Sequence, residues 1–329
     1  MAQLLKRLSG GEALSLDEAY LLAREILSGD LSDVAIAAAL TAMRCRGETA
    51  EEVAGFVKFA REVAVKVPLR VEAIDTAGTG GDGAGTINLS TAAAVVAAAA
   101  GARVLKHGNR SASGLFGSAD FMEAVGYNLD VGPEKAAEMV ERVGFAFVFA
   151  PKYHPAFARV APVRRQLPFR TVFNIVGPLA NPGLVKRQLI GVSERRLLDV
   201  VGGVASMLLD TALVVYGSGV DEVSAEGPTE VVEVRRGKTE RYVVTPEDFG
   251  VQKTPIPRAS SREEAVALAL AGLRGEHREA MVAIAVNASA ALYVAGVARD
   301  FRDGYGLAVN AIREGAAYRK LVEAVEASR

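Results

Sequence analysis

The sequence has 329 residues, of which half are hydrophobic and 23 % are charged, with a formal net charge of −1. That length suits one large domain or two, and the composition is that of a globular protein with material for a sizeable core. The near-zero net charge argues against a nucleic-acid-binding protein, and a single cysteine excludes a disulfide framework and a thiolate metal cluster.

The amino-terminal residues lack the apolar core of a signal peptide. The longest run of small apolar residues, 92–100, is far short of the roughly 20 residues that a membrane span needs. Together with the lone Cys45, which fits a reducing compartment, these features predict a cytoplasmic protein without membrane contact.

Residues 1–67 are predicted to form only helices, as a small amino-terminal domain. Ser15 with Glu18 and Thr49 with Glu52 each fit a capping box, in which a hydroxyl and a carboxylate satisfy free backbone N–H groups at the start of a helix. The alanine-rich face of residues 35–43 would allow another helix to approach closely. That face would pack either on a second copy of the chain or on its own domain.

Residues 68–329 alternate between short apolar strands and helices, which predicts an α/β domain with a mainly parallel central sheet covered by helices. The predicted strands are 71–75, 103–107, 145–149, 188–192 and 212–216, followed by a hairpin of 230–235 and 239–244. The predicted helices are 91–100, 119–125, 134–143, 195–209, 261–273, 278–294 and 305–327.

Positive charge is concentrated in two stretches that contain no Asp or Glu. One lies between Gly83 and Ala119, and the other runs from Arg142 to Ser193. Together they hold eleven of the 38 Lys and Arg residues, which leaves 27 basic against 39 acidic residues in the rest of the chain. This distribution predicts two segments that attract anions in an otherwise acidic molecule.

The first of these stretches opens with a glycine-rich loop, Gly78-Thr-Gly-Gly-Asp-Gly83, which fits G-x-G-x-x-G. That string alone is weak, because a dinucleotide site also needs an acid about 20 residues further on. Here the next predicted strand ends in Lys106 and His107, with no acid before Asp120. Glycine loops ahead of a helix present backbone N–H groups to anions, so we interpret the loop as a phosphate site.

Three further stretches carry candidate residues. Lys106-His-Gly-Asn-Arg-Ser-Ala-Ser113, with Gly117 and Ser118 after it, has the donors of a second phosphate loop. One of the adjacent Arg164 and Arg165 is expected to hold a substrate carboxylate. Asp221 and Glu222 follow glycines after the fifth predicted strand, where α/β sheets bind ligands, and such a pair suits Mg²⁺.

In this order the motifs resemble those of the anthranilate phosphoribosyltransferase family, almost from end to end. Further matches are His154-Pro-Ala, Phe173-Asn-x-x-Gly-Pro-Leu-x-Asn-Pro and Asn287-Ala-x-Ala-Ala-Leu-Tyr. The resemblance implies a small helical domain joined to the α/β domain, a segment near 160–185 that returns to the helical side, and a homodimer formed through the helical domain. It also implies attack of anthranilate on phosphoribosyl pyrophosphate, with release of pyrophosphate and use of Mg²⁺, in tryptophan biosynthesis.

The resemblance implies residue roles as well. Lys106, Asn109 and Arg164 would be catalytic, and Gly78, Asn109 and Arg164 would bind anthranilate. Ser90, Asp221 and Glu222 would hold the metal. Phosphoribosyl pyrophosphate would be bound by Gly78, Gly81, Asp82, Thr86, Asn88, Leu89, Ser90, Thr91, Lys106, His107, Gly108, Asn109, Arg110, Ser111, Ala112, Ser113, Gly114 and Ser118. The chain departs from the family at Gly114-Leu-Phe, where a polar or basic pair is common.

Two alternatives stay open. A pyrimidine nucleoside phosphorylase shares the fold and a Lys-His loop, but that family has serine where this chain has Gly108. A non-catalytic relative that binds nucleic acid could use the two basic stretches. The Asp221-Glu222 pair and the run 88–91 argue against it. We therefore expect two small-molecule substrates as partners and no nucleic acid.

Overall fold

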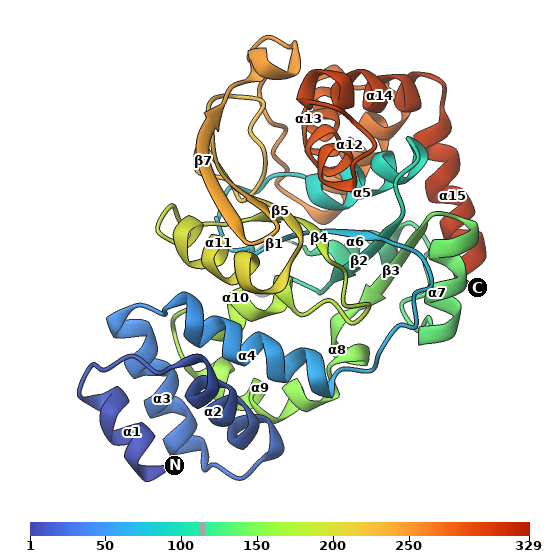
Figure 1. Cartoon of the computed structure of the whole chain (residues 1–329). Helices are drawn as coiled ribbons and strands as arrows, with labels where there is room; N and C mark the ends of the chain where they lie inside the picture. Colours follow the sequence, from blue (N-terminus) through green and yellow to red (C-terminus); the bar gives the residue numbers. More distant parts are fainter. Residues whose placement is uncertain (112–115) are drawn as a thin grey trace.

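The structure, a computed structural model, describes residues 1–111 and 116–329 (Figure 1). Four helices form its amino-terminal end: α1 (Ala2–Ser9), α2 (Leu16–Ser28), α3 (Asp33–Arg46) and α4 (Ala50–Val63). Both predicted capping boxes form, one at the start of α2 and one at the start of α4. In each, the hydroxyl accepts a backbone N–H and the glutamate accepts the N–H of the cap residue.

A seven-stranded sheet lies at the centre of the molecule, in the order β3-β2-β1-β4-β5-β6-β7. The strands are β1 (Ile74–Gly78), β2 (Val104–Gly108), β3 (Phe145–Phe149), β4 (Arg187–Gly191), β5 (Thr211–Gly217), β6 (Thr229–Arg235) and β7 (Lys238–Val244). The first five in chain order are parallel, and β6 and β7 add an antiparallel hairpin at one edge. The predicted mainly parallel sheet is confirmed.

The first strand begins three residues later than predicted. The apolar run favoured 71–75, but β1 pairs residue by residue with β4, from Ile74 beside Arg187 to Gly78 beside Gly191. The parallel ladder, which a single sequence does not reveal, therefore sets the boundary of the strand. As a result, the glycine-rich loop begins directly at the carboxyl end of β1.

Helices surround the sheet, and the carboxyl-terminal ones lie at the opposite end of the molecule from α1–α4 (Figure 1). They are α5 (Leu89–Ala99), α6 (Ser118–Ala124), α7 (Pro133–Arg142), α8 (Ala150–Tyr153), α9 (Ala161–Gln166), α10 (Val172–Leu179), α11 (Leu197–Leu208), α12 (Arg262–Arg274), α13 (Arg278–Ala295), α14 (Phe301–Arg313) and α15 (Ala316–Ser328). The single helix predicted over 305–327 is wrong. Gly315 has a left-handed φ of 71° and separates α14 from α15.

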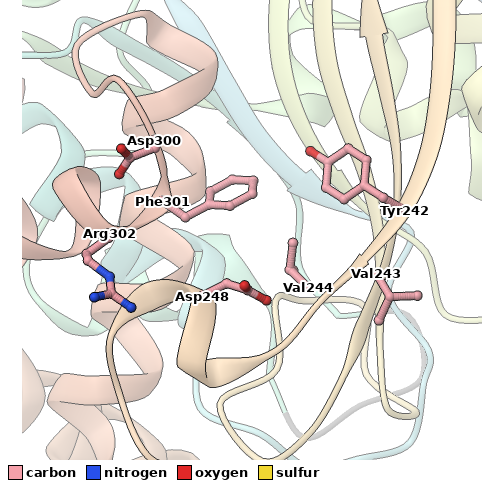
Figure 2. Close-up of a pocket in the computed structure, with 7 residues that line it drawn as sticks. All are labelled: Tyr242, Val243, Val244, Asp248, Asp300, Phe301 and Arg302. Atoms are coloured by element: carbon pink, nitrogen blue, oxygen red, sulfur yellow. The ribbon is translucent and has the colours of Figure 1, made fainter.

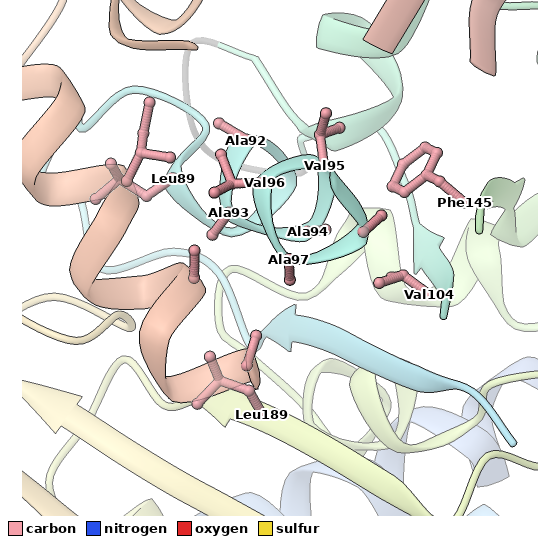
Figure 3. Close-up of a cluster of buried hydrophobic side chains, with 14 of the residues drawn as sticks. Leu89, Ala92, Ala93, Ala94, Val95, Val96, Ala97, Val104, Phe145 and Leu189 are labelled. Atoms are coloured by element: carbon pink, nitrogen blue, oxygen red, sulfur yellow. The ribbon is translucent and has the colours of Figure 1, made fainter. Parts of the chain in front are cut away.

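Two hydrophobic cores lie on opposite faces of the sheet. Alternate strand residues point to opposite faces, so Leu189 and Leu213 enter one core and Ile190 and Val214 the other. In the first core, α5 is buried against α13 and α15, and its small side chains lie near Val104 (Figure 3). In the second, α4 and α10 share a core with α11, which joins the amino-terminal helices to the sheet.

Helix α13 is the one helix in the described part of the chain that is long and apolar enough to cross a membrane, by length and composition alone. Within the protein, 72 % of it is buried. It packs against α5 and α14, so the core that it fills accounts for its apolar side chains.

The segment 155–181 runs alongside the amino-terminal helices and then returns to the sheet. Helix α9 contacts α3 and α10 contacts α4, where Arg61 donates to the Leu179 carbonyl at 2.7 Å. Asn181 then donates to Asp75 Oδ2 and to the Leu105 carbonyl, both at 2.8 Å. Burial raises the pKa of Asp75 to about 6. This segment therefore ties the helical region to the base of β1 and β2.

Candidate functional site

Most of the described site residues that the sequence predicts lie at the carboxyl ends of the parallel strands, whereas Arg164 lies on α9, in the segment beside the amino-terminal helices. The chain continues from β1 to β2 on one side, whereas β4 continues to β5 on the other. The strand order therefore reverses between β1 and β4, which is the position at which α/β sheets bind ligands. The glycine-rich loop follows β1, and Asp221 and Glu222 follow β5.

The glycine-rich loop and Asp221 are packed directly against each other. A Cβ atom at Gly78 would lie 2.3 Å from Asp221 Oδ2, and one at Gly191 would lie 1.6 Å from the Asp221 carbonyl oxygen. Only glycine leaves room at these two positions. The Gly80 N–H donates to Asp221 Oδ2 at 2.6 Å, and the Asp221 N–H donates to Asp82 Oδ2 at 3.4 Å.

Lys106 and Glu222 meet at the start of α5. The Ser90 N–H donates to Glu222 Oε1 at 3.0 Å. Lys106 is only 2 % exposed, and its ammonium donates to Ser90 Oγ at 2.7 Å and to the Thr76 carbonyl. A buried ammonium, a helix amino terminus and a carboxylate therefore converge on one serine.

Burial shifts the pKa values of these groups towards their neutral forms. Burial, together with the charge of Asp82, raises the pKa of Asp221 to about 7. Burial and the charge of Asp221 raise the pKa of Glu222 as well. Burial lowers the pKa of Lys106, while the nearby carboxylates, Asp75 first, oppose that shift. The carboxylates thus carry an unfavourable negative charge that a bound cation would offset.

The residues fit a divalent cation only if substrate oxygens complete its coordination. Within residues 1–111 and 116–329, no group of three or more His, Cys, Asp or Glu side chains could hold a metal ion alone. Asp221, Glu222 and the Ser90 hydroxyl offer hard oxygen donors at one place. Mg²⁺ typically takes one or two carboxylates together with substrate phosphates, so this donor set suits it.

The start of α5 offers further polar groups. Its cap residue, Asn88, makes no side-chain capping bond, and Asn88 Oδ1 is buried without a partner. Leu89 is fully buried in the core, and its N–H donates to the Ile87 carbonyl at 2.6 Å. Thr86 forms an isolated bridge with Arg258, and Thr91 is buried. The side chain of Leu89 therefore belongs to the core.

The loop after β2 is closed by Ser118, at the start of α6. A Cβ atom at Gly108 would lie 2.2 Å from Ser118 Oγ, so glycine is needed there too. Ser118 Oγ accepts the Asn109 N–H at 3.2 Å and donates to the Asn109 carbonyl at 3.2 Å. The Ser111 N–H lies 3.4 Å from Asp120 Oδ2. Three predicted site residues of this loop lie outside the described residues: Ala112, Ser113 and Gly114.

The Arg110 side chain is paired within the protein. Its guanidinium pairs with Asp120 at 2.6 Å and with Glu123 at 2.7 Å, and it lies 5.7 Å over the ring of Phe149. These two acids raise the pKa of Arg110. The Arg110 side chain therefore joins the end of β2 to α6.

His107 also points away from Lys106, because successive strand residues face opposite sides of the sheet. Its ring is buried 5.0 Å from the ring of His154, and burial lowers the pKa of both side chains, that of His154 to about 4. The His107 N–H donates to Asp75 Oδ1 at 3.1 Å. Lys106 alone of this pair brings its side chain to the carboxylates.

The two adjacent arginines differ in their surroundings. Arg164, on α9, is half-buried, and its guanidinium lies 5.6 Å over the ring of Phe173 on α10, whereas Arg165 is exposed. In the part of the chain that the structure describes, no carboxylate pairs with Arg164. Burial lowers its pKa, although an arginine stays charged near neutral pH. A half-buried cation on an aromatic ring is a fitting site for an aromatic carboxylate.

The prediction missed Arg170, in the turn between α9 and α10. Its guanidinium donates to Ser193 Oγ at 2.7 Å and to the Thr79 carbonyl within the glycine-rich loop. The sequence shows Arg170 only as one of eight basic residues in the second acid-free stretch. Its contact with residue 79 is a long-range contact that composition does not reveal.

A surface hollow of about 460 Å³ lies elsewhere, between β7 and the start of α14 (Figure 2). Its polar side chains are engaged within the protein: Tyr242 donates to Glu233 at 2.7 Å, and Arg302 donates to the Glu247 carbonyl at 3.1 Å. None of the predicted site residues lines the hollow.

Two protein-family models match the chain, one over its α/β part and one over its amino-terminal helices. Residues 70–318 match the model of the glycosyl transferase family α/β domain, and residues 2–64 match the model of its helical bundle domain. The two matches together span nearly all of the chain.

The chain is 86 % identical to an anthranilate phosphoribosyltransferase from Pyrobaculum islandicum over 329 residues, all of both chains. It is 48 % identical to one from Aeropyrum pernix, over 99 % of this chain and 96 % of the relative. Its fold matches the crystal structure of the Thermus thermophilus enzyme with a TM-score of 0.93 at 40 % identity, over 99 % of each chain. It also matches the Saccharomyces cerevisiae enzyme in complex with phosphoribosyl pyrophosphate and Mg, with a TM-score of 0.84 at 25 % identity. This match covers 95 % of this chain and 92 % of the yeast chain.

Proposed function

The chain belongs to the anthranilate phosphoribosyltransferases, and on that premise we propose how its residues divide the reaction. The enzyme transfers the phosphoribosyl group of 5-phosphoribosyl 1-pyrophosphate to the amine of anthranilate. The products are N-(5-phosphoribosyl)anthranilate and pyrophosphate, in tryptophan biosynthesis. Neither a nucleoside phosphorylase nor a non-catalytic nucleic-acid-binding protein is favoured.

One observation carries the assignment of the site: the buried ammonium of Lys106 donates to Ser90 at the start of α5, and the N–H of the same serine donates to Glu222. The site would thus offer a polyphosphate both backbone N–H groups and a buried cation. We assign the phosphate role to the loop 78–91 and to Lys106. We assign the same role to the backbone of residues 108–111 and to Ser118, which bonds to Asn109.

We propose that Ser90, Asp221 and Glu222 contribute ligands to Mg²⁺. The metal would neutralise charge that accumulates on pyrophosphate as it leaves. In the structure Asp221 accepts the Gly80 N–H and Glu222 accepts the Ser90 N–H. Release of these carboxylates would free both N–H groups for phosphate oxygens. The same two bonds would thus be exchanged when substrate binds.

For anthranilate we propose Arg164 as the carboxylate partner, with Asn109 and Gly78 at the border between the two substrates. The planar guanidinium can hold a carboxylate with two parallel hydrogen bonds. Phe173 lies beneath Arg164 and restricts the orientation of its guanidinium. The amine of anthranilate is neutral at pH 7, so attack on the sugar does not require a strong general base.

The residues therefore act by positioning and by electrostatic stabilisation. Arg164 would hold the acceptor near the sugar, which raises the effective concentration of the amine. Lys106 and the backbone N–H groups would stabilise the leaving pyrophosphate as its charge grows. We expect a transition state in which the sugar has oxocarbenium character.

We also propose a cytoplasmic homodimer formed through the amino-terminal helices. Leu21 of α2 is 39 % exposed and Val34 of α3 is 81 % exposed, which leaves apolar side chains on that surface. Light scattering after size-exclusion chromatography measures the mass. A homodimer has twice the 34.5 kDa of the chain, and a stable monomer would contradict the proposal.

The assay for the function follows the loss of anthranilate fluorescence on addition of phosphoribosyl pyrophosphate and Mg²⁺. We expect the fluorescence to fall, and pyrophosphate to appear in equal amount. Thymidine with phosphate is the control for the phosphorylase alternative, and no reaction is expected there. Freshly folded protein that leaves anthranilate unchanged would contradict the assignment.

A further inference from the structure

Arg170 is a half-buried cation whose partners are not carboxylates. Nη1 donates to Ser193 Oγ at 2.7 Å, and Nη2 donates to the Thr79 carbonyl. In the part of the chain that the structure describes, no Asp or Glu forms an ion pair with it. Burial lowers the pKa of Arg170, and acids such as Asp221 and Glu194 oppose that shift. Burying a charge costs free energy unless the charged group is hydrogen-bonded. The hydrogen bonds to Ser193 and Thr79 therefore hold the Arg170 guanidinium in its half-buried position.

The peptide unit between Thr79 and Gly80 is held from both of its ends. Its carbonyl accepts from Arg170, and its N–H donates to Asp221 Oδ2 at 2.6 Å. A peptide unit is planar, so fixing the direction of the carbonyl also fixes the direction of the N–H. Gly80 has a left-handed φ of 63°, which lets the chain turn away after this peptide.

Thr79 is also joined to the end of β4. Its N–H donates to the Gly191 carbonyl at 2.9 Å, and Thr79 Oγ1 accepts the Ser193 N–H at 3.0 Å. Thr79 Oγ1 lies 3.2 Å from Ser193 Oγ, the group that accepts from Arg170. The resulting network spans the ends of β1 and β4, where the strand order reverses. Arg170 closes this network from the helical side.

Arg170 belongs to the segment that carries the acceptor residues. It lies in the turn between Arg164 on α9 and Phe173 on α10, whose ring lies under the Arg164 guanidinium. Glu194, which follows Ser193 in the chain, lies 3.7 Å from Arg44 of α3. Because Arg170 lies in the α9–α10 turn and donates to the Thr79 carbonyl, a shift of that turn would move the carbonyl.

We propose that Arg170 is a positioning residue that orients the Thr79–Gly80 peptide and so presents the Gly80 N–H to an anion. In the structure this N–H donates to the Asp221 carboxylate, and in the complex it would donate to a phosphate oxygen of phosphoribosyl pyrophosphate. This inference rests on the proposed function and extends it. It names the side chain through which the acceptor segment sets the geometry of the phosphate loop.

The test is the variant Arg170→Met, with binding of phosphoribosyl pyrophosphate and Mg²⁺ measured by titration calorimetry in the absence of anthranilate. Loss of hydrogen bonds from a charged group predicts binding about tenfold weaker. The KM for phosphoribosyl pyrophosphate should rise by a similar factor, and the anthranilate KM should rise less. Arg170→Lys keeps one donor to the carbonyl and should weaken binding only about threefold.

Arg159→Met is the matched control. Arg159 lies on the same returning segment and donates to Asp33 Oδ1 at 2.8 Å and to the Leu31 carbonyl at 2.9 Å. It makes no contact with the glycine-rich loop. Its loss loosens the segment from α3, so a purely structural effect would appear in this variant too. We expect its affinity for phosphoribosyl pyrophosphate to stay within about twofold of the wild-type value.

Equal weakening in Arg170→Met and Arg159→Met would overturn the inference, as would a change in the anthranilate KM alone. If Arg170→Met does not fold, Ser193→Ala replaces it, because it removes the acceptor of Nη1. That variant should bind about two- to threefold more weakly, and unchanged binding overturns the inference. Wild-type protein that binds no phosphoribosyl pyrophosphate would instead overturn the proposed function.

Discussion

The proposed phosphate half of the site, around the glycine-rich loop, and the proposed acceptor half, at Arg164, differ in the partners of their charged groups. Around the glycine-rich loop, Asp221 and Glu222 accept backbone N–H groups and Lys106 donates to Ser90 and Thr76. At the acceptor half, the Arg164 guanidinium rests on an aromatic ring without a carboxylate partner in the described part of the chain.

This difference implies two modes of binding. In the proposed phosphate half, the substrate and its metal would replace bonds that already exist. In the proposed acceptor half, the substrate would supply the anion. We therefore expect loss of Lys106 to weaken transition-state stabilisation and loss of Arg164 to weaken ground-state binding.

The largest effect is expected for Lys106→Ala. Loss of one well-placed electrostatic donor typically lowers kcat by about 10²- to 10³-fold. Steady-state kinetics with saturating substrates measures this effect. Lys152→Ala, which removes an exposed ammonium 3.7 Å from Asp130, is the control and should keep the wild-type rate. A near-normal kcat for Lys106→Ala would remove Lys106 from the phosphate site.

Arg164→Ala should weaken the binding of anthranilate and leave the proposed phosphate half of the site intact. A charge-assisted bidentate pair contributes about 1.5–3 kcal/mol, so the anthranilate KM should rise roughly 10- to 100-fold. The KM for phosphoribosyl pyrophosphate should change much less. Arg165→Ala, its exposed neighbour, is the control. The reverse pattern of KM changes would place Arg164 with the phosphates.

The smallest effect is a pH dependence that only the phosphate half should show. The pKa of Asp221 is raised to about 7, so below that pH the free enzyme holds a proton that metal binding must displace. Affinity for Mg²⁺ with phosphoribosyl pyrophosphate should therefore fall as pH drops, by about fivefold between pH 7 and pH 6, because the deprotonated fraction of Asp221 falls by that factor. Calorimetry across pH 5.5–8 measures it, with Asp221→Asn expected to show a shallower dependence.

Much of the fold followed from local patterns. The capping boxes at Ser15 and Thr49 form as predicted, and the strand at 145–149 has the predicted limits, because a short apolar run between turns depends little on its partners. Pairing with β4 moved β1 by three residues, and a left-handed glycine divided the last predicted helix. The position of β1 depends on the strand beside it, and the division of the last predicted helix depends on the backbone angle of Gly315.

The sequence by itself determined the chemistry of the site: which residue types are present, in what order, and which loops carry them. Only the tertiary structure decided which way they face. Lys106 points to the carboxylates, whereas its neighbour His107 packs behind the sheet against His154. Arg170 joins the glycine-rich loop although more than 90 residues separate it from Thr79. Motif spacing fixes neighbours along the chain, but side-chain direction and long-range contacts arise only when strands pair and helices pack.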